Sequence, residues 1–173
     1  MGLANDLGYR YEQPNALHAL VQKVASSKGG AWLFSKLLHH ADRVVSGATG
    51  AATTASTIFA GMPVIDLTTI GARSGDPRTT PLLGIPTGDH LAIIGSGWGQ
   101  APTPGWVYNL RANPEATVAH KGKSVTVLAR AAEGDELDRI WATARQLYDG
   151  YAKYPVRASH REIAVFVLEP AGA

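Results

Sequence analysis

Residues 115–131 read EATVAHKGKSVTVLARA, in which two short apolar runs are joined by Lys121-Gly122. Short apolar runs separated by turn residues are typical of antiparallel sheets. A two-residue connection that contains glycine fits a tight hairpin. We therefore predict paired strands at Glu115–His120 and Lys123–Ala131.

The same pattern extends on both sides of this hairpin. Gly88-Asp89 is a second hairpin-compatible connection. High glycine content, 19 of 173 residues, also favours a strand-rich fold with many turns. Four further runs bring the predicted strands to six: Pro63–Ile70, Arg78–Pro86, His90–Ser96 and His160–Glu169.

Helical spacing of apolar residues occurs between and before these strands. The clearest case runs from Leu137 to Leu147 behind Asp135 and Glu136, whose charges suit a helix N-terminus. A shorter helix is predicted to open at Thr103-Pro104 and to end before Pro114. Two more are predicted near residues 14–27 and 34–45. Together with the strands, they predict an α+β protein.

The length of 173 residues suits one structural domain. We expect residues 1–61, two helices and the small-residue loop 46–61, to pack on a barrel formed by residues 62–173. The uncharged stretch 44–65 is rich in small residues and is a poor membrane span. Without a signal pattern, a cytoplasmic location is expected, and peripheral membrane contact through the N-terminal helices stays open.

Composition excludes several kinds of chemistry. Zero cysteine excludes disulfides, thiolate zinc sites, iron–sulfur clusters and cysteine nucleophiles. His39 and His40 are neighbours on a predicted helix and point in different directions, so no metal is predicted. Residues 61–130 hold six basic and four acidic side chains. This mild bias suits a small anionic ligand better than nucleic acid.

The first candidate site is the stretch 68–82, TTIGARSGDPRTTPL. It is predicted to be a strand, a turn and a second strand. Arg73 and Arg78 carry planar guanidinium groups that suit phosphate or carboxylate oxygens, and glycine lets an anion approach the backbone. The alternative is an ordinary polar hairpin with solvated arginines.

The second candidate is Gly95-Ser96-Gly97-Trp98-Gly99, which follows a predicted strand. It has Gly-x-Gly but no third glycine at the position that a dinucleotide-binding motif requires, and no βαβ unit surrounds it. We interpret it as a glycine-lined floor for a flat ring, with a simple glycine-rich turn as the alternative.

The third candidate is Tyr148, Tyr151 and Tyr154, spaced by three after the clearest helix. Three tyrosines on one side of a turn can wall an apolar pocket and donate hydrogen bonds. Gly150 and Pro155 predict an irregular segment there, as in a pocket lid. The alternative is that these rings are core or surface aromatics.

These motifs together resemble the deazaflavin-dependent nitroreductase family of actinobacteria, which uses the reduced deazaflavin coenzyme F420. Five stretches carry the resemblance in order: LTTIGARSGDPRTTPLL at 67–83, IIGSGWG at 93–99, PGWVYNLRANP at 104–114, LYDGYAKY at 147–154 and REIAVFVLEP at 161–170.

The resemblance implies a split β-barrel. It implies that Arg73 and Arg78 hold the anionic tail of the cofactor, and that Pro81, Leu82 and the Ser96-Gly97 loop line its ring. The full predicted cofactor-binding set is Arg73, Ser74, Arg78, Thr80, Pro81, Leu82, Ser96, Gly97, Trp98, Gly99, Trp106 and Asn109. Tyr148, Tyr151 and Tyr154 match the substrate-side tyrosines of the family, as candidate catalytic residues that orient the acceptor.

The implied activity is hydride transfer from F420H2 to a small-molecule acceptor, such as a quinone, a nitroaromatic or an α,β-unsaturated carbonyl. A tyrosine or a bound water would give the proton. A non-catalytic F420-binding protein and an FMN-binding or haem-binding split barrel are the alternatives, and monomer and homodimer both stay open. Ala72 and Val107-Tyr108 depart from the family pattern, where a basic residue and a Tyr-His pair are common.

Overall fold

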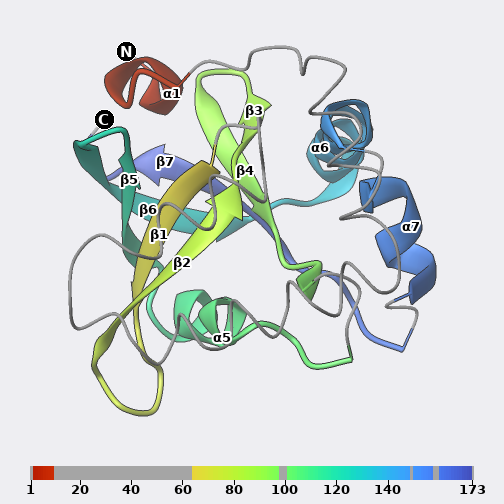
Figure 1. Cartoon of the computed structure of the whole chain (residues 1–173), viewed down its shortest axis with the longest axis horizontal. Coiled ribbons are helices and arrows are strands. Elements are labelled where there is room, and N and C mark those ends of the chain that lie inside the picture. Colours follow the sequence, from red (N-terminus) through yellow and green to blue (C-terminus); the bar gives the residue numbers. More distant parts are fainter. Residues whose placement is uncertain (1, 10–63, 98–100, 149, 158–159, 173) are drawn as a thin grey trace.

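The computed structural model describes residues 2–9, 64–97, 101–148, 150–157 and 160–172 (Figure 1). The two predicted N-terminal helices, the loop 46–61 and the predicted ring-site residues Trp98 and Gly99 lie outside these residues.

One curled antiparallel sheet forms the centre of the fold (Figure 1). Its seven strands lie in the order β2-β1-β5-β6-β7-β4-β3. Their bounds are β1 Val64–Ile70, β2 Pro77–Leu83, β3 Ile85–Thr87, β4 His90–Ile94, β5 Glu115–His120, β6 Lys123–Ala131 and β7 Val165–Pro170. Every neighbouring pair is antiparallel. The predicted α+β class and antiparallel sheet are confirmed.

The strand count of six was wrong, because the run Arg78–Pro86 forms two strands separated by Gly84. The hydroxyl of Tyr9 donates a hydrogen bond to the Gly84 carbonyl. A Cβ atom at Gly84 would lie 3.1 Å from the Tyr9 hydroxyl oxygen. Contact with a distant aromatic residue therefore accompanies the break between β2 and β3, and local sequence does not reveal that contact.

The central hairpin matches its prediction, since β5 and β6 have the predicted bounds. Lys121 and Gly122 both have positive φ, 46° and 80°, as a tight type I′ connection requires. β7, in contrast, begins at Val165 rather than at the predicted His160. Residues 160–164 precede it and lie beside the loop that follows β4, where Gly95 donates a hydrogen bond to the Ala164 carbonyl.

The described residues include four helices: α1 Leu3–Asp6, α5 Gly105–Ala112, α6 Gly134–Leu147 and α7 Gly150–Arg157. The predictions of α5 and α6 are confirmed, whereas α1 was not predicted. The irregular segment predicted after Leu147 was also wrong, because it forms α7. A Cβ atom at Gly150 would overlap the Tyr148 ring. Glycine thus permits close packing at the start of this helix.

The described core has two layers, one on each face of β4 and β7. Alternate residues of β4 enter different layers: Leu91 and Ile93 join the cluster that contains α1 and α5 side chains, while Ala92 and Ile94 join the cluster beneath α6 and α7. Figure 1 shows α6 and α7 together on one side of the sheet, and α5 at the end of the sheet that carries the turn between β1 and β2. No helix among the described residues is long and apolar enough to cross a membrane.

Candidate functional site

The turn between β1 and β2, residues 71–76, is built by backbone hydrogen bonds. Gly71 donates to the Asp76 carbonyl at 2.8 Å, and Gly75 donates to the Gly71 carbonyl at 2.8 Å. Gly75 has a φ of 73°, which favours glycine. Arg73 and Arg78 are both exposed at this turn. We call residues 71–78 the arginine turn.

Polar side chains gather over Gly71. A Cβ atom at Gly71 would lie 2.7 Å from Ser74 Oγ and 3.4 Å from Arg78 Nε. Ser74 Oγ also accepts a hydrogen bond of 3.3 Å from the Asp76 N–H. The structure therefore brings together two of the predicted anion-binding residues, a hydroxyl and a guanidinium, beside a backbone without a side chain.

Asn109 of α5 supports the arginine turn from below. Its Oδ1 accepts a 3.0 Å hydrogen bond from the Ala72 N–H, and its Nδ2 donates one of 3.0 Å to Thr69 Oγ1. Asn109 and Thr69 are both buried. Both ends of the Asn109 amide are thus engaged by the protein, so Asn109 positions the turn.

Ala72, which departs from the family pattern, takes part in this arrangement through its backbone. Its N–H donates the hydrogen bond to Asn109 Oδ1, and the residue itself is exposed.

The loop after β4 is held by a residue that sequence reasoning did not assign. Arg161 donates from Nη1 to the Gly95 carbonyl at 3.0 Å and from Nη2 to the Ser96 carbonyl at 2.8 Å. Burial lowers the pKa of Arg161 from its ordinary value, and the nearby Tyr108 opposes this shift. Arg161 begins the REIAVFVLEP stretch of the resemblance, but spacing alone gives no sign of a bond to a loop 65 residues earlier.

Glycine is required in this loop on steric grounds. Gly97 has a φ of 53°. A Cβ atom at Gly95 would lie 2.9 Å from Val107 Cγ2, so α5 packs directly under the loop. Val107-Tyr108 is the second place where the sequence departs from the family pattern. Val107 is fully buried under the loop, and Tyr108 is 54% exposed on the surface.

The curled sheet brings the predicted ring-lining residues toward one another. β2 carries Thr80, Pro81 and Leu82, all half-buried. β2 is at one edge of the sheet, yet it approaches β4, whose end leads into Ser96 and Gly97. The approach of these two strands is visible in Figure 1.

Trp106, another predicted cofactor residue, lies beneath this region. It is 5% exposed and packs edge-on against Phe166, with ring centroids 6.1 Å apart. Its ring belongs to the interior core cluster.

The three predicted site tyrosines form one buried cluster. Tyr148, Tyr151 and Tyr154 are 3%, 6% and 2% exposed. Their ring centroids lie 5.5–6.3 Å apart. Burial raises the pKa of Tyr151 above its usual value, with a further contribution from Tyr148, so the neutral hydroxyl is favoured in the folded protein. We call these three residues the tyrosine cluster.

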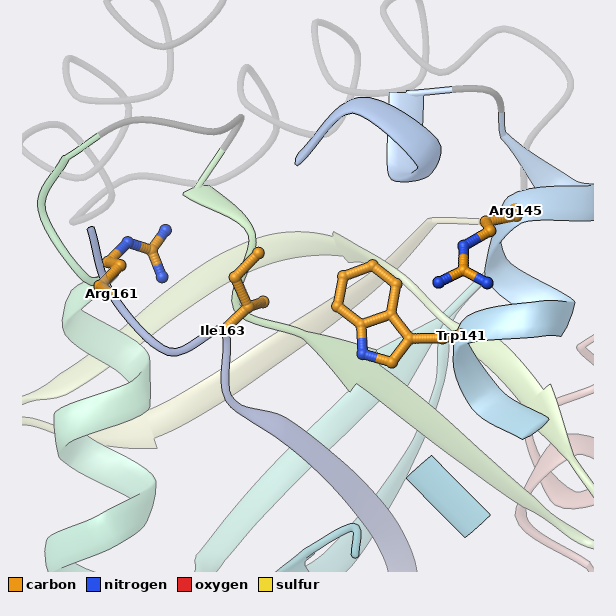
Figure 2. Close-up of a pocket in the computed structure, with 4 residues that line it drawn as sticks. All are labelled: Trp141, Arg145, Arg161 and Ile163. Atoms are coloured by element: carbon orange, nitrogen blue, oxygen red, sulfur yellow. The ribbon is translucent and has the colours of Figure 1, made fainter. Parts of the chain in front are cut away.

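A pocket adjoins this cluster through Trp141, and Figure 2 shows the side chains that line the pocket. Its volume is about 310 Å³, and Trp141, Arg145, Arg161 and Ile163 line it. Trp141 packs edge-on against Tyr151, with centroids 6.2 Å apart. Figure 2 shows Trp141 and Ile163 between the two arginines. The pocket therefore adjoins both the tyrosine cluster, through Trp141, and the loop after β4, through Arg161.

Metal ligation is not a feature of the described site. Within the part of the chain that the structure describes, no three acidic or histidine side chains are grouped so that they could hold a metal ion.

The chain is similar to a known protein family and to one of its members. The family model described as F420H(2)-dependent quinone reductase matches residues 40–170. An F420H(2)-dependent quinone reductase of Mycobacterium tuberculosis is 35% identical over 109 residues, which are 61% of this chain and 72% of that protein.

Two solved structures are similar to the chain. One, described as an F420-H2 dependent reductase (FDR-A), has a TM-score of 0.56 and 34% identity, and the match covers 62% of this chain and 94% of that one. A second, described as a domain-swapped dimer, has a TM-score of 0.57 and 26% identity over 82% of this chain and all of that one. The curled sheet thus has the split-barrel architecture of the FDR-A reductase.

Proposed function

This chain belongs to the F420H(2)-dependent quinone reductase family, and we propose that it binds its cofactor between the arginine turn and the loop after β4. It is an oxidoreductase with F420H2 as its hydride donor. The binding proposal rests on the polar side chains that gather over Gly71. Ser74 Oγ and Arg78 Nε lie close to the position that a Cβ atom of Gly71 would occupy, so the backbone there is open to a ligand.

The arginine turn suits an anionic tail on physical grounds. Arg73 and Arg78 are exposed, so their guanidinium groups are accessible to phosphate or carboxylate oxygens. Asn109 fixes the Ala72 backbone, which reduces the conformational freedom that the turn would lose on binding. A tail held by such a turn gains affinity from preorganisation as well as from charge.

The ring of the cofactor is proposed to lie between Pro81, Leu82 and the Ser96-Gly97 loop, with Thr80 beside it. Half-buried apolar side chains on β2 supply a surface for a flat ring. Arg161 fixes the opposite wall by holding the Gly95 and Ser96 carbonyls. Trp106 supports this region from the core, and Trp98 and Gly99 keep the predicted role given above.

When bound, F420H2 would transfer a hydride to the quinone and release a proton as it becomes oxidised F420, and a proton given by a tyrosine or a bound water would complete the hydroquinone. The chain supplies orientation and a dry surface. Loop residues held by Arg161 keep one wall of the site fixed, and buried apolar residues beneath it exclude water.

The tyrosine cluster is proposed to bound the acceptor side of the site. Burial favours the neutral form of the Tyr151 hydroxyl, so Tyr151 would not act as a base there. Nitroaromatic and α,β-unsaturated carbonyl acceptors are proposed in addition to quinones, since both take a hydride at an electron-poor centre. A homodimer is proposed as the assembly, in view of the similar structure that is described as a swapped dimer.

Two measurements test this function. Fluorescence titration with coenzyme F420, beside FMN and NADPH, should show tight binding of F420 only. Stopped-flow mixing of the protein and F420H2 with menadione should then show oxidation of the bound cofactor. Tight FMN binding without F420 binding would favour the FMN-binding alternative, and F420 binding without menadione turnover would favour the non-catalytic one.

A further inference from the structure

The pocket lined by Trp141, Arg145, Arg161 and Ile163 has a chemistry of its own. Trp141 and Ile163 give it an apolar floor, and the two arginines flank that floor (Figure 2). These four residues carry two positive charges and no negative one. The guanidinium carbon of Arg145 lies 5.8 Å from the centroid of the Trp141 ring, within the range of a cation–π contact. The lining thus suits a ligand that is flat and carries a negative charge.

The pocket lies next to the loop that is proposed to line the cofactor ring. Arg161 lines the pocket and also holds the carbonyls of Gly95 and Ser96, in the loop proposed to line the cofactor ring. A ligand in the pocket would therefore lie beside the proposed ring site. The volume of about 310 Å³ is at the lower end of the range for small-molecule sites, which suits a bicyclic ring system.

We propose that this pocket binds the electron acceptor, and that Arg145 selects flat acceptors that carry an ionised hydroxyl or carboxylate group. The proposal rests on the quinone reductase function described above and adds to it a preference for charge. Trp141 supplies the stacking surface, and the tyrosine cluster supports Trp141 from behind through the Tyr151 ring.

Arg145 is the better residue for a test, because Arg161 also holds the loop after β4. Arg145 is exposed on α6, so its replacement by glutamine removes the charge without opening the core. Arg139 lies on the same helix, is also exposed and does not line the pocket. Arg139→Gln is therefore the matched control, and Arg145→Lys tests rescue by charge alone.

The experiment compares two naphthoquinones of similar shape as acceptors for F420H2. The 2-hydroxy-1,4-naphthoquinone is ionised at neutral pH, whereas 2-methyl-1,4-naphthoquinone is uncharged. Each quinone is compared with itself across the variants, so their different reduction potentials cancel. Arg145→Gln should lower kcat/KM about fivefold for the anionic quinone and less than twofold for the uncharged one. Arg145→Lys and Arg139→Gln should stay within twofold of the parent for both.

Equilibrium dialysis of the anionic quinone against the protein without cofactor gives a readout that is independent of turnover. Its dissociation constant should rise about fivefold in Arg145→Gln and stay unchanged in Arg139→Gln. Equal effects on both quinones, or no effect of Arg145→Gln on binding, would overturn the proposed preference. If the parent protein reduces neither quinone, the reductase function itself fails, whereas turnover of both with no role for Arg145 removes only this inference.

Discussion

The arginine turn and the tyrosine cluster are both short motifs with regular spacing, but the side chains of the turn are exposed and those of the cluster are buried. The turn is shaped by backbone hydrogen bonds and leaves Arg73 and Arg78 exposed. The cluster is shaped by packing, since its three rings are at most 6% exposed and contact one another edge to face or tilted. The side chains of the turn are therefore available to a ligand, whereas those of the cluster are largely committed to the protein.

This difference separates two ways of building a site. A rigid backbone that presents exposed side chains can lose one of them without losing stability. A buried cluster cannot, because each ring fills space that its neighbours need. Substitutions in the two regions should accordingly change different quantities, binding in one and stability in the other.

The largest effect is expected at the centre of the tyrosine cluster. Tyr151 contacts Tyr148, Tyr154 and Trp141. Tyr151→Ala should lower the free energy of unfolding by about 3–5 kcal/mol, because it leaves a cavity in the core. Urea denaturation measures this. Tyr108→Ala removes the same ring from a position that is 54% exposed and should cost less than about 0.5 kcal/mol. A loss below about 1 kcal/mol at Tyr151 would mean that the cluster is not a packing unit.

The arginine turn should give the reverse result. Arg73→Ala and Arg78→Ala should each raise the dissociation constant of coenzyme F420 roughly tenfold or more, since charge-assisted hydrogen bonds contribute about 1.5–3 kcal/mol. Their unfolding free energies should stay within about 0.5 kcal/mol of the parent. Fluorescence titration and urea denaturation give the two quantities, with the exposed Arg139→Ala as control. If both dissociation constants stay within twofold, the tail binds elsewhere.

How far the sequence predicted each region depends on the range of the interactions that shape it. The hairpin of β5 and β6 follows from residues within 17 positions, and its bounds were predicted correctly. The break at Gly84 is accompanied by a hydrogen bond from Tyr9, 75 residues away, and was missed. α7 was also missed, because Gly150 and Pro155 have low helix propensity. In the folded protein this helix buries Tyr151 and Tyr154.

For the candidate site, sequence identified residue types better than their roles. Arg73 and Arg78 are exposed at the arginine turn, and their role in binding the cofactor stays a prediction. Asn109 was predicted to bind the cofactor, and the structure shows both ends of its amide engaged by the protein. Arg161 and the pocket residue Trp141 had no assigned role. Bonds from a side chain to a distant carbonyl leave no periodic signal, so only the folded structure reveals them.

A smaller effect, on both stability and F420 affinity, is expected at Asn109, which links the core to the arginine turn. Asn109→Ala removes two hydrogen bonds and should lower the unfolding free energy by about 1–2 kcal/mol. Because the Ala72 backbone loses its support, F420 affinity should also fall, about threefold. Asn113→Ala is the control, since Asn113 Oδ1 accepts a hydrogen bond from the Glu115 N–H at an exposed turn. Unchanged F420 affinity in Asn109→Ala would show that the turn does not need this support.

The smallest expected effect concerns the tyrosine hydroxyl rather than its ring. Burial raises the pKa of Tyr151, so the neutral hydroxyl is favoured in the folded protein, while the unfolded chain ionises near pH 10. Above that pH the unfolded state loses a proton that the folded state keeps, and stability falls as the pH rises.

Tyr151→Phe keeps the ring and removes this ionisation. The difference in unfolding free energy between the parent protein and Tyr151→Phe should therefore be constant between pH 7 and 9. At pH 10.5 it should shift by about 0.8 kcal/mol in favour of the variant, because the contribution grows toward about 1.4 kcal/mol per pH unit above the unfolded pKa. Urea denaturation at each pH measures it. Parallel stability curves through pH 10.5 would mean that the Tyr151 hydroxyl ionises as readily in the folded protein as in the unfolded chain, and the cluster would then be open to solvent like the arginine turn.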